Sequence, residues 1–184
     1  MPNPVSFIAS FFIAIAVMVV FPLYQLLDRQ EDQAQILAQT ATVSFVDSVR
    51  NKGYITPNMY EEYFQLLHSS GYTFDIEIEH QAKSYHPVYE DPANPSTFTG
   101  EYIVTYDHYY NSQILEILFP DNTLQQDNVT RRYELIAGDF INVRVKNSTY
   151  TPVSILRDAV TNHASDDPTS IHILYGGMVH NEDY

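Results

Sequence analysis

The first part of the chain is continuously apolar, because no charged side chain occurs from Val5 to Leu27. At about 1.5 Å per residue, a helix over this stretch is roughly 34 Å long, which is enough to cross the hydrocarbon of a bilayer. The opening Met-Pro-Asn-Pro has no basic residue, and Phe21-Pro22-Leu23-Tyr24 offers no small-residue cleavage site. A cleaved secretory signal needs both features, so we expect this segment to be retained.

Pro22 lies inside the apolar stretch. It predicts a kink or a locally melted turn near residues 18–22, because proline lacks an N–H and clashes with the preceding turn. Beyond Asp28 the pattern becomes amphipathic as far as Gly53, so we predict one long helix whose second half packs a single stripe against a globular domain. The expected stripe contains Ile36, Leu37, Ala41, Phe45, Val46 and Val49.

Beyond Gly53 the pattern predicts shorter elements. Thr56-Pro57 is typical of a helix start, and apolar residues then recur on one face as far as Gly71. Residues 73–79 alternate strictly between apolar and polar or acidic side chains, which predicts a half-buried strand. The next expected elements are an irregular loop or hairpin tip at 85–100, a short strand at 102–106 and a helix at 107–119.

Two β-type runs, 133–136 and 140–146, flank the turn Ala137-Gly138-Asp139 and predict an antiparallel hairpin with Gly138 at positive φ. A helix at 154–160 and a strand at 171–175 complete the chain. The predicted fold class is α+β, with a long N-terminal helix packed on a small antiparallel sheet and short helices. We divide the chain into a hydrophobic helix, residues 1–32, and a globular domain, 33–184, which includes the amphipathic continuation of the helix.

The chain is strongly acidic, with 9 Lys+Arg against 23 Asp+Glu and a formal net charge of -14. A phosphate backbone would be repelled, so we expect no binding to nucleic acid. The same charge favours a domain placed outside, away from an anionic cytoplasmic leaflet. The lack of cysteine removes disulfides and thiolate sites, while 15 Tyr and 10 Phe suit both a core and subunit contacts.

Carboxylates and histidines raise the question of a metal site. The candidates are Asp75, Glu77 and Glu79 on one face of a strand beside His80, and His163 with Asp166 and Asp167. We favour a solvated acidic strand face, because no two histidines are spaced i, i+4 on a helix and no cysteine accompanies them. The chain also lacks a Gly-x-Ser-x-Gly motif and a phosphate-binding glycine loop, so we expect neither an enzyme nor a bound cofactor. Asn128 and Asn147 begin candidate glycosylation triplets.

A long helix with an apolar first half, Pro22 and an amphipathic second half leading into an antiparallel sheet resembles the type IV pilin and pseudopilin architecture. Phe45-Val46-Asp47 and Gly53-Tyr54-Ile55-Thr56 are also similar to small membrane-anchored proteins of Gram-positive Tad-like pilus, secretion or conjugation systems. In pilins the apolar halves leave the membrane and bundle into the core of a filament. The chain departs from that family at Val5, because pilins carry a glutamate at the fifth mature position.

The resemblance implies a structural subunit of a cell-surface or extracellular filament, anchored in the membrane before assembly and polymerising with copies of itself. Its other partner would be pilus or secretion assembly machinery. The alternative is a single-pass, membrane-anchored accessory or binding subunit of a secretion or conjugation apparatus, whose helix stays in lipid. The residues expected to form the assembly helix are Val5, Phe7, Ile8, Phe11, Phe12, Ala14, Ile15, Val19 and Pro22.

Overall fold

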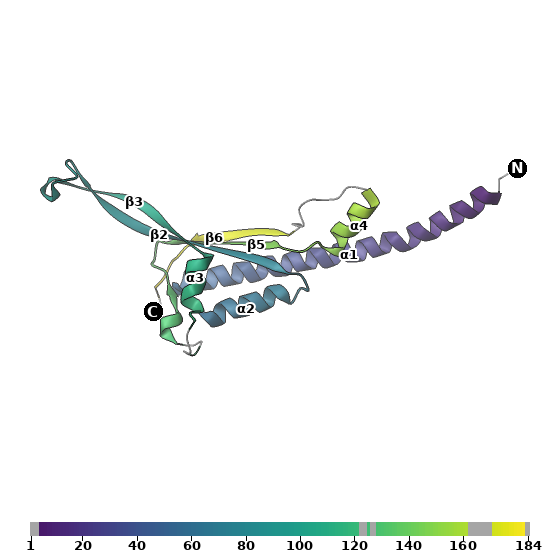
Figure 1. Ribbon diagram of the computed structural model, residues 1–184, viewed down its shortest axis with the longest axis horizontal. Coiled ribbons are helices and arrows are strands. Elements are labelled where there is room, and N and C mark those ends of the chain that lie inside the picture. Colours follow the sequence, from purple (N-terminus) through teal and green to yellow (C-terminus); the bar gives the residue numbers. More distant parts are fainter. Residues whose placement is uncertain (1–3, 122–124, 126–127, 162–170, 183–184) are drawn as a thin grey trace.

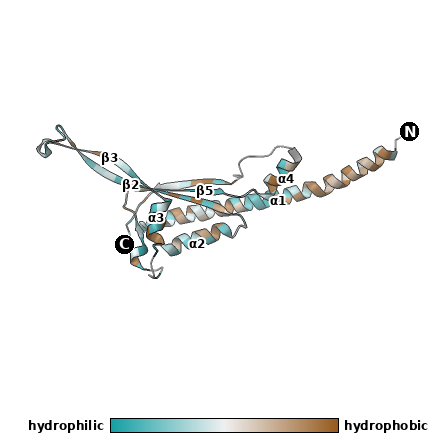
Figure 2. Cartoon of the chain, viewed as in Figure 1, coloured by the Kyte–Doolittle hydropathy of each residue, from teal (hydrophilic) through white to brown (hydrophobic). Residues whose placement is uncertain are grey.

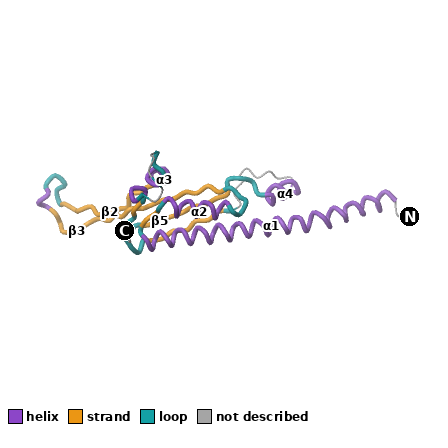
Figure 3. The backbone as a smooth tube through the Cα atoms, turned by 90° about the horizontal axis from the view of Figure 1, so that it is seen from below, coloured by secondary structure: helices purple, strands orange, loops and turns teal. Residues whose placement is uncertain are grey.

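The long helix α1 (Pro4–Lys52) runs along the folded body and extends well beyond it at its N-terminal end (Figure 1). The computed structural model describes residues 4–121, 125, 128–161 and 171–182. The assignment of α1 is helical throughout, including Pro22, so the melted turn expected near residues 18–22 is absent. Figure 3 likewise shows α1 without a sharp bend. One missing N–H removes one bond of the helical ladder, and the bonds of the adjacent turns hold the helix across this gap.

The second half of α1 buries a stripe of mostly small residues. Ile36 was expected in this stripe but is 64% exposed, so that part of the prediction is wrong. Ala34, Ala38 and Ala41 lie in the buried stripe instead, and their small side chains let the helix approach the body closely. The buried residues are Ala34, Ala38, Ala41, Thr42, Phe45, Val46 and Val49.

Helix α2 (Pro57–His68) follows a short strand, β1 (Tyr54–Ile55), and packs beside α1. The predicted start is confirmed: the Thr56 hydroxyl accepts a hydrogen bond from the Met59 N–H at 3.3 Å. Tyr63 joins the two helices, since its ring stacks on Phe45 with centroids 4.5 Å apart. Its hydroxyl also lies 2.9 Å from the Thr42 hydroxyl, so the polar end of the ring is satisfied inside the core.

A four-stranded antiparallel sheet covers α1, and its strand order is β3-β2-β5-β6. Alternate apolar residues of the three strands β2, β5 and β6 face the helices and join their buried residues in one core. The predicted α+β architecture, a long helix packed on an antiparallel sheet with short helices, is therefore confirmed. The strands are β2 (Phe74–Tyr89), β3 (Phe98–Tyr110), β5 (Phe140–Asn147) and β6 (His172–Met178).

The expected hairpin at 133–146 is wrong. Strand β4 (Tyr133–Glu134) pairs with β1, whereas β5 pairs with β2 and β6. Other segments occupy the backbone groups that such a hairpin needs: the Leu135 N–H donates to the Gly53 carbonyl at 2.7 Å, and the Gly138 N–H donates to the Val179 carbonyl at 3.0 Å. The turn itself exists, with Gly138 at φ 100° as predicted.

Strands β2 and β3 are longer than expected and form one hairpin, which confirms a hairpin tip within 85–100. The helix expected from Asp107 instead begins four residues later as α3 (Asn111–Leu118). Asn111 fixes this start, because its amide donates to the Ile76 carbonyl at 2.9 Å and its oxygen accepts from the Ile78 N–H at 3.2 Å. Residues before Asn111 therefore stay in register with β2.

Smaller elements complete the body. Helix α4 (Pro152–Thr161) agrees with the helix expected at 154–160, and β6 agrees with the last expected strand. The 3-10 turns are η1 (Pro95–Thr97) and η2 (Val129–Arg131).

The C-terminal residues cross the end of α1. There the Arg50 carbonyl accepts a hydrogen bond from the His180 N–H at 2.8 Å, and the Arg50 guanidinium donates one to the Met178 carbonyl at 2.9 Å.

We predict that Gly138→Val lowers the free energy of unfolding by about 1–3 kcal/mol, because a β-branched residue is strained at positive φ. Chemical denaturation followed by circular dichroism measures the change. Ala137→Val is the matched control, since Ala137 is the exposed neighbour of Gly138 and receives the same side chain. Equal stability of the two variants would contradict the assigned turn.

Candidate assembly surface

The apolar segment, residues Val5–Leu27 of α1, lies outside the folded body (Figure 2). The most apolar 18-residue window of α1 has a mean hydropathy of 2.5, and none of that window is buried by the described chain. The helix is therefore long and apolar enough to cross a membrane. The residues expected to form contacts are all exposed, with Phe7 at 74%: Val5, Phe7, Ile8, Phe11, Phe12, Ala14, Ile15, Val19 and Pro22.

Large apolar side chains cover most of the circumference of the segment, so it does not suit water. Each Å² of apolar surface left in water costs about 25 cal/mol, and a soluble monomer does not expose a continuous patch of this size. Phe11 and Phe12 make an edge-to-face contact with ring centroids 6.2 Å apart, but no described part of the body covers them. Lipid or other protein chains must therefore cover the segment.

Small residues recur along one side of the segment. Ser6, Ser10 and Ala14 are four positions apart and lie on the same helix face. The Ser10 hydroxyl donates to the Ser6 carbonyl at 2.8 Å, so this polar group is satisfied without water. A face of this kind lets a second helix approach closely, as in helix pairs within membranes.

A charged collar, residues 28–32, separates the apolar segment from the body. It carries Asp28, Arg29, Glu31 and Asp32. Glu31 provides a contact with the body, since its carboxylate accepts a hydrogen bond from the Thr151 hydroxyl at 2.8 Å. The first buried residue of α1 is Ala34. The segment thus leaves the body as a direct, unbroken continuation of a packed helix.

The buried His80 forms a polar network at the base of the β2–β3 hairpin. Its two ring nitrogens lie 2.7 Å from the Tyr133 hydroxyl and 2.9 Å from the Asp139 carboxylate. Asp139 also accepts backbone N–H bonds from Lys83 and Ile136, both at 2.8 Å. Burial is the main cause that raises the pKa of Tyr133, so this phenol stays neutral.

This network resembles a proton relay, but His80 is 4% and Asp139 is 2% exposed. A substrate cannot reach either group in this conformation, and a polar cluster tying β2, β4 and the 136–139 turn together is the role that the geometry supports. The sequence pattern missed Tyr133 and Asp139 as partners of His80, because the three residues are far apart in the chain. No sequence spacing signals this contact.

The acidic face of β2 carries Glu77 and Glu79, which have partners on the neighbouring strands. Glu77 is 2.8 Å from Arg144 and 3.4 Å from Lys146, and Glu79 is 2.7 Å from His108. A hydrogen bond from Arg144 is the main cause that lowers the pKa of Glu77, and one from His108 lowers that of Glu79. Within the described residues, no group of three or more His, Cys, Asp or Glu could hold a metal ion. His163, Asp166 and Asp167 lie outside those residues.

The two candidate glycosylation residues differ in their surroundings. Asn128 is half-buried, and its side-chain oxygen accepts from the Thr130 N–H at 3.0 Å. Asn147 is buried, and its amide nitrogen, the atom that a glycan would modify, donates to the Thr149 carbonyl at 2.8 Å. A glycan at Asn147 would have to break this contact, so Asn128 is the better placed of the two.

A scan against protein-family models, a search of curated proteins and a search of solved structures find no match for this chain.

We predict that removal of residues 1–27 yields a water-soluble protein that separates from membranes and forms no fibres, because the whole apolar segment is then gone. The Glu31–Thr151 contact and the buried stripe remain, so the body should keep its circular dichroism spectrum. Fractionation of the cell extract tests the outcome. Persistent membrane association would show that a second apolar surface anchors the chain.

We predict that Asp139→Ala lowers the free energy of unfolding by about 3–5 kcal/mol, because it leaves His80 and two backbone N–H groups without their acceptor. Asp107→Ala is the control, since Asp107 is an exposed residue of β3 and its removal should change little. Urea denaturation measures both. Similar stability of the two variants would rule out the network.

Proposed function

We propose that this chain is a pilin-like structural subunit of an extracellular filament, which assembles through its apolar segment. The observation that carries the proposal is the exposure of every residue from Val5 to Leu23 on a helix that continues without a break into the body. A lipid anchor needs only a flexible connection to its domain. A rigid connection is useful where the position of the domain must follow the position of the helix, as it must in a filament wall.

Assembly would bring the apolar segments together in a bundle without bulk water. In such a bundle the face of Ser6, Ser10 and Ala14 permits close approach, while Phe and Val side chains fill the remaining space. The carbonyl that lacks a partner because of Pro22 can bond to a neighbouring helix. Before assembly the same segment would hold the chain in the membrane, with the acidic domain outside and pilus or secretion machinery as its partner.

The second candidate is a single-pass, membrane-anchored accessory or binding subunit of a secretion or conjugation apparatus. The length and mean hydropathy of the helix favour it equally, because both suit a helix that stays in lipid. The two functions differ in what surrounds Phe11, Phe12 and Val19. Copies of the same helix surround them in a filament, and lipid or foreign chains surround them in an accessory subunit.

We predict that Ala14→Trp abolishes polymers while the protein stays in the membrane fraction. Tryptophan is nearly neutral for insertion into lipid but separates tightly packed helices at a position that holds a small residue. Phe12→Trp is the matched control, because it introduces the same side chain where a large one already lies. Electron microscopy of the purified variants counts the filaments.

The outcome separates the two candidate functions. Loss of filaments in Ala14→Trp alone supports packing through the small-residue face. Normal filaments in both variants would remove the segment from the filament core. A wild-type protein that never polymerises would favour the accessory subunit.

A further inference from the structure

Helix α4 (Pro152–Thr161) lies at the border between the body and the apolar segment. The Thr151 hydroxyl, directly before α4, donates to the Glu31 carboxylate at 2.8 Å, so the start of α4 is level with the charged collar. From there α4 packs beside α1 and leaves the body in the direction of the N-terminus (Figures 1 and 3). Its 10 residues are about 15 Å long, and Glu31 lies only about 6 Å beyond Leu27 along α1. Helix α4 therefore reaches the level at which the apolar segment ends.

The exposed side of α4 is apolar. Val153 and Ser154 are buried on the side that packs against the body. Pro152, Ile155 and Ala159 are spaced three and four positions apart, so they share one face, and all three are exposed. A helix at the surface of a soluble domain normally presents polar side chains on its exposed face. The opposite pattern in α4 indicates that something other than water covers this face.

Two tyrosines lie within about one helical turn of the collar. Tyr24 is half-buried and lies four positions before Asp28 on α1, whereas Tyr150 is 46% exposed and immediately precedes Thr151. Tyrosine is enriched where hydrocarbon meets water, because its ring is apolar and its hydroxyl is polar. Their position marks the collar and the start of α4 as the level of the membrane surface.

The charges of α4 limit how deeply it can enter a membrane. Arg157 and Asp158 lie on the sides of α4 away from Pro152 and Ile155, and a helix of 10 residues is too short to cross the hydrocarbon. A helix with one apolar face and charges on its other sides lies in the plane between headgroups and acyl chains. The chain has a net charge of -14, so apolar contact, and not attraction to anionic headgroups, must provide the binding.

We propose that the face of Pro152, Ile155 and Ala159 inserts into the lipid surface next to α1. This face continues the lipid-covered surface of the apolar segment, whose last turn includes Leu26, 55% exposed. The proposal rests on the membrane-anchored state that both candidate functions include, and it adds a second, shallow contact to that anchor.

The second contact has a consequence for orientation. One membrane-spanning helix fixes the depth of the body but leaves it free to rotate about the axis of α1. Helix α4 removes this rotation and fixes the direction of the β2–β3 hairpin, which projects from the opposite end of the body (Figure 1). Three side chains alone bind lipid weakly, and they act because α1 holds them at the surface at high effective concentration. Removal of residues 1–27 should therefore still release the body.

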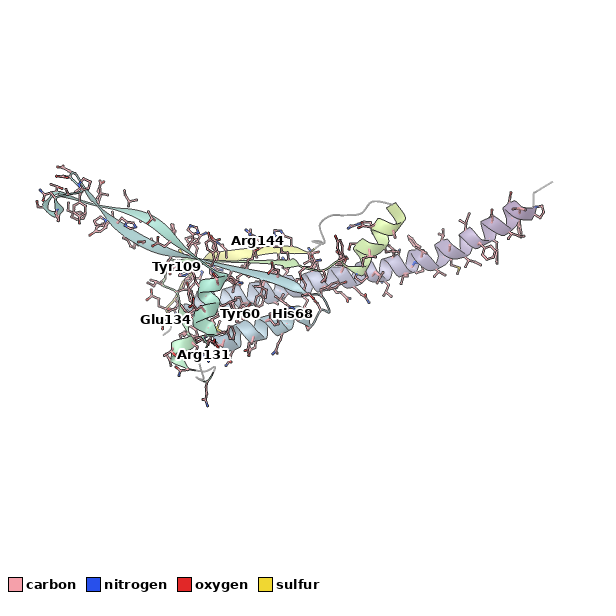
Figure 4. The ribbon with its side chains drawn as sticks, in the orientation of Figure 1. Tyr60, His68, Tyr109, Arg131, Glu134 and Arg144 are labelled. Atoms are coloured by element: carbon pink, nitrogen blue, oxygen red, sulfur yellow. The ribbon has the colours of Figure 1, made fainter. Side chains whose placement is uncertain are left out.

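The chain has no tryptophan, so an introduced one is a unique fluorescent reporter. Ile155→Trp is placed in the full chain and reconstituted in vesicles of neutral phosphatidylcholine with brominated acyl chains, which quench tryptophan on contact. Ile136→Trp is the matched control, because Ile136 is 59% and Ile155 is 58% exposed. Figure 4 shows Glu134, two residues before Ile136, at the end of the body away from α4.

The proposal expects bromine to quench Ile155→Trp about two- to threefold more than Ile136→Trp, since an interfacial helix buries its apolar face among the acyl chains. Ala159→Trp reports the same face one turn later and keeps the test decisive if one variant misfolds. Equal quenching of the α4 variants and the Ile136→Trp control overturns the proposal. Emission from Ile155→Trp that is shifted to the blue without quenching also overturns it, because protein and not lipid then covers the face.

Phe12→Trp, deep in the apolar segment, separates this proposal from the proposed function. If bromine quenches Phe12→Trp but neither α4 variant, the α4 contact is wrong and the membrane anchor stands. If Phe12→Trp is not quenched, the segment does not lie in lipid, and the α4 contact fails together with the anchor. The number of filaments seen by electron microscopy is a separate result, because the α4 contact needs only a chain held in the membrane.

Discussion

The close packing of α1 on the sheet is the contact on which the rest of the structure depends. Alanines at positions 34, 38 and 41 let the helix backbone approach the body, and the buried side chains of Val46 and Val49 join the core. Other elements attach to this helix in turn: α2 through the stacked rings of Phe45 and Tyr63, and the C-terminal residues through Arg50. Because the same helix continues as the apolar segment, this packing fixes the direction in which the segment leaves the body.

The buried polar network has a comparable role at the other end. Asp139 accepts the N–H of Lys83 at the base of the β2–β3 hairpin, while His80 joins the same carboxylate to Tyr133. Hydrogen bonds of this kind have fixed directions, whereas apolar contacts do not. The network therefore ties the base of the β2–β3 hairpin to β4 and to the 136–139 turn. The two projecting parts of the molecule are each held by a contact suited to the task, one by close packing and one by directed bonds.

Local patterns predicted much of this fold, because local forces decide much of it. The start of α2 depends on Thr56 and the turn at Gly138 depends on backbone freedom, and both are properties of a few adjacent residues. Strand pairing is different. Strand β5 pairs with β2 and not with β4, and no short window of the sequence contains both β5 and β2. The start of α3 was misplaced for the same reason: Asn111 bonds to β2, which is more than thirty residues earlier, as the separations of 33 and 35 residues show.

The candidate surfaces divide in the same way. The apolar segment is visible in the sequence because its property is a sum over consecutive residues. The row of exposed aromatic residues on the β2–β3 hairpin is not, because Phe98, Tyr102 and Tyr106 are separated along β3 and Tyr85 joins them from the other strand. His80 likewise gains its meaning only from Asp139 and Tyr133, which the fold brings to it.

The alignment of α1 with the strands has a mechanical consequence. In Figure 1, β5 and β6 run nearly along the axis of α1, so a pull on the apolar segment acts along the interface between helix and sheet. Tension in this direction loads the contacts of Ala34 to Val49 together, as in a shear joint, and does not peel them apart one after another. This geometry resists force along the longest dimension of the molecule, the direction in which a chain held by its N-terminal helix would be stretched.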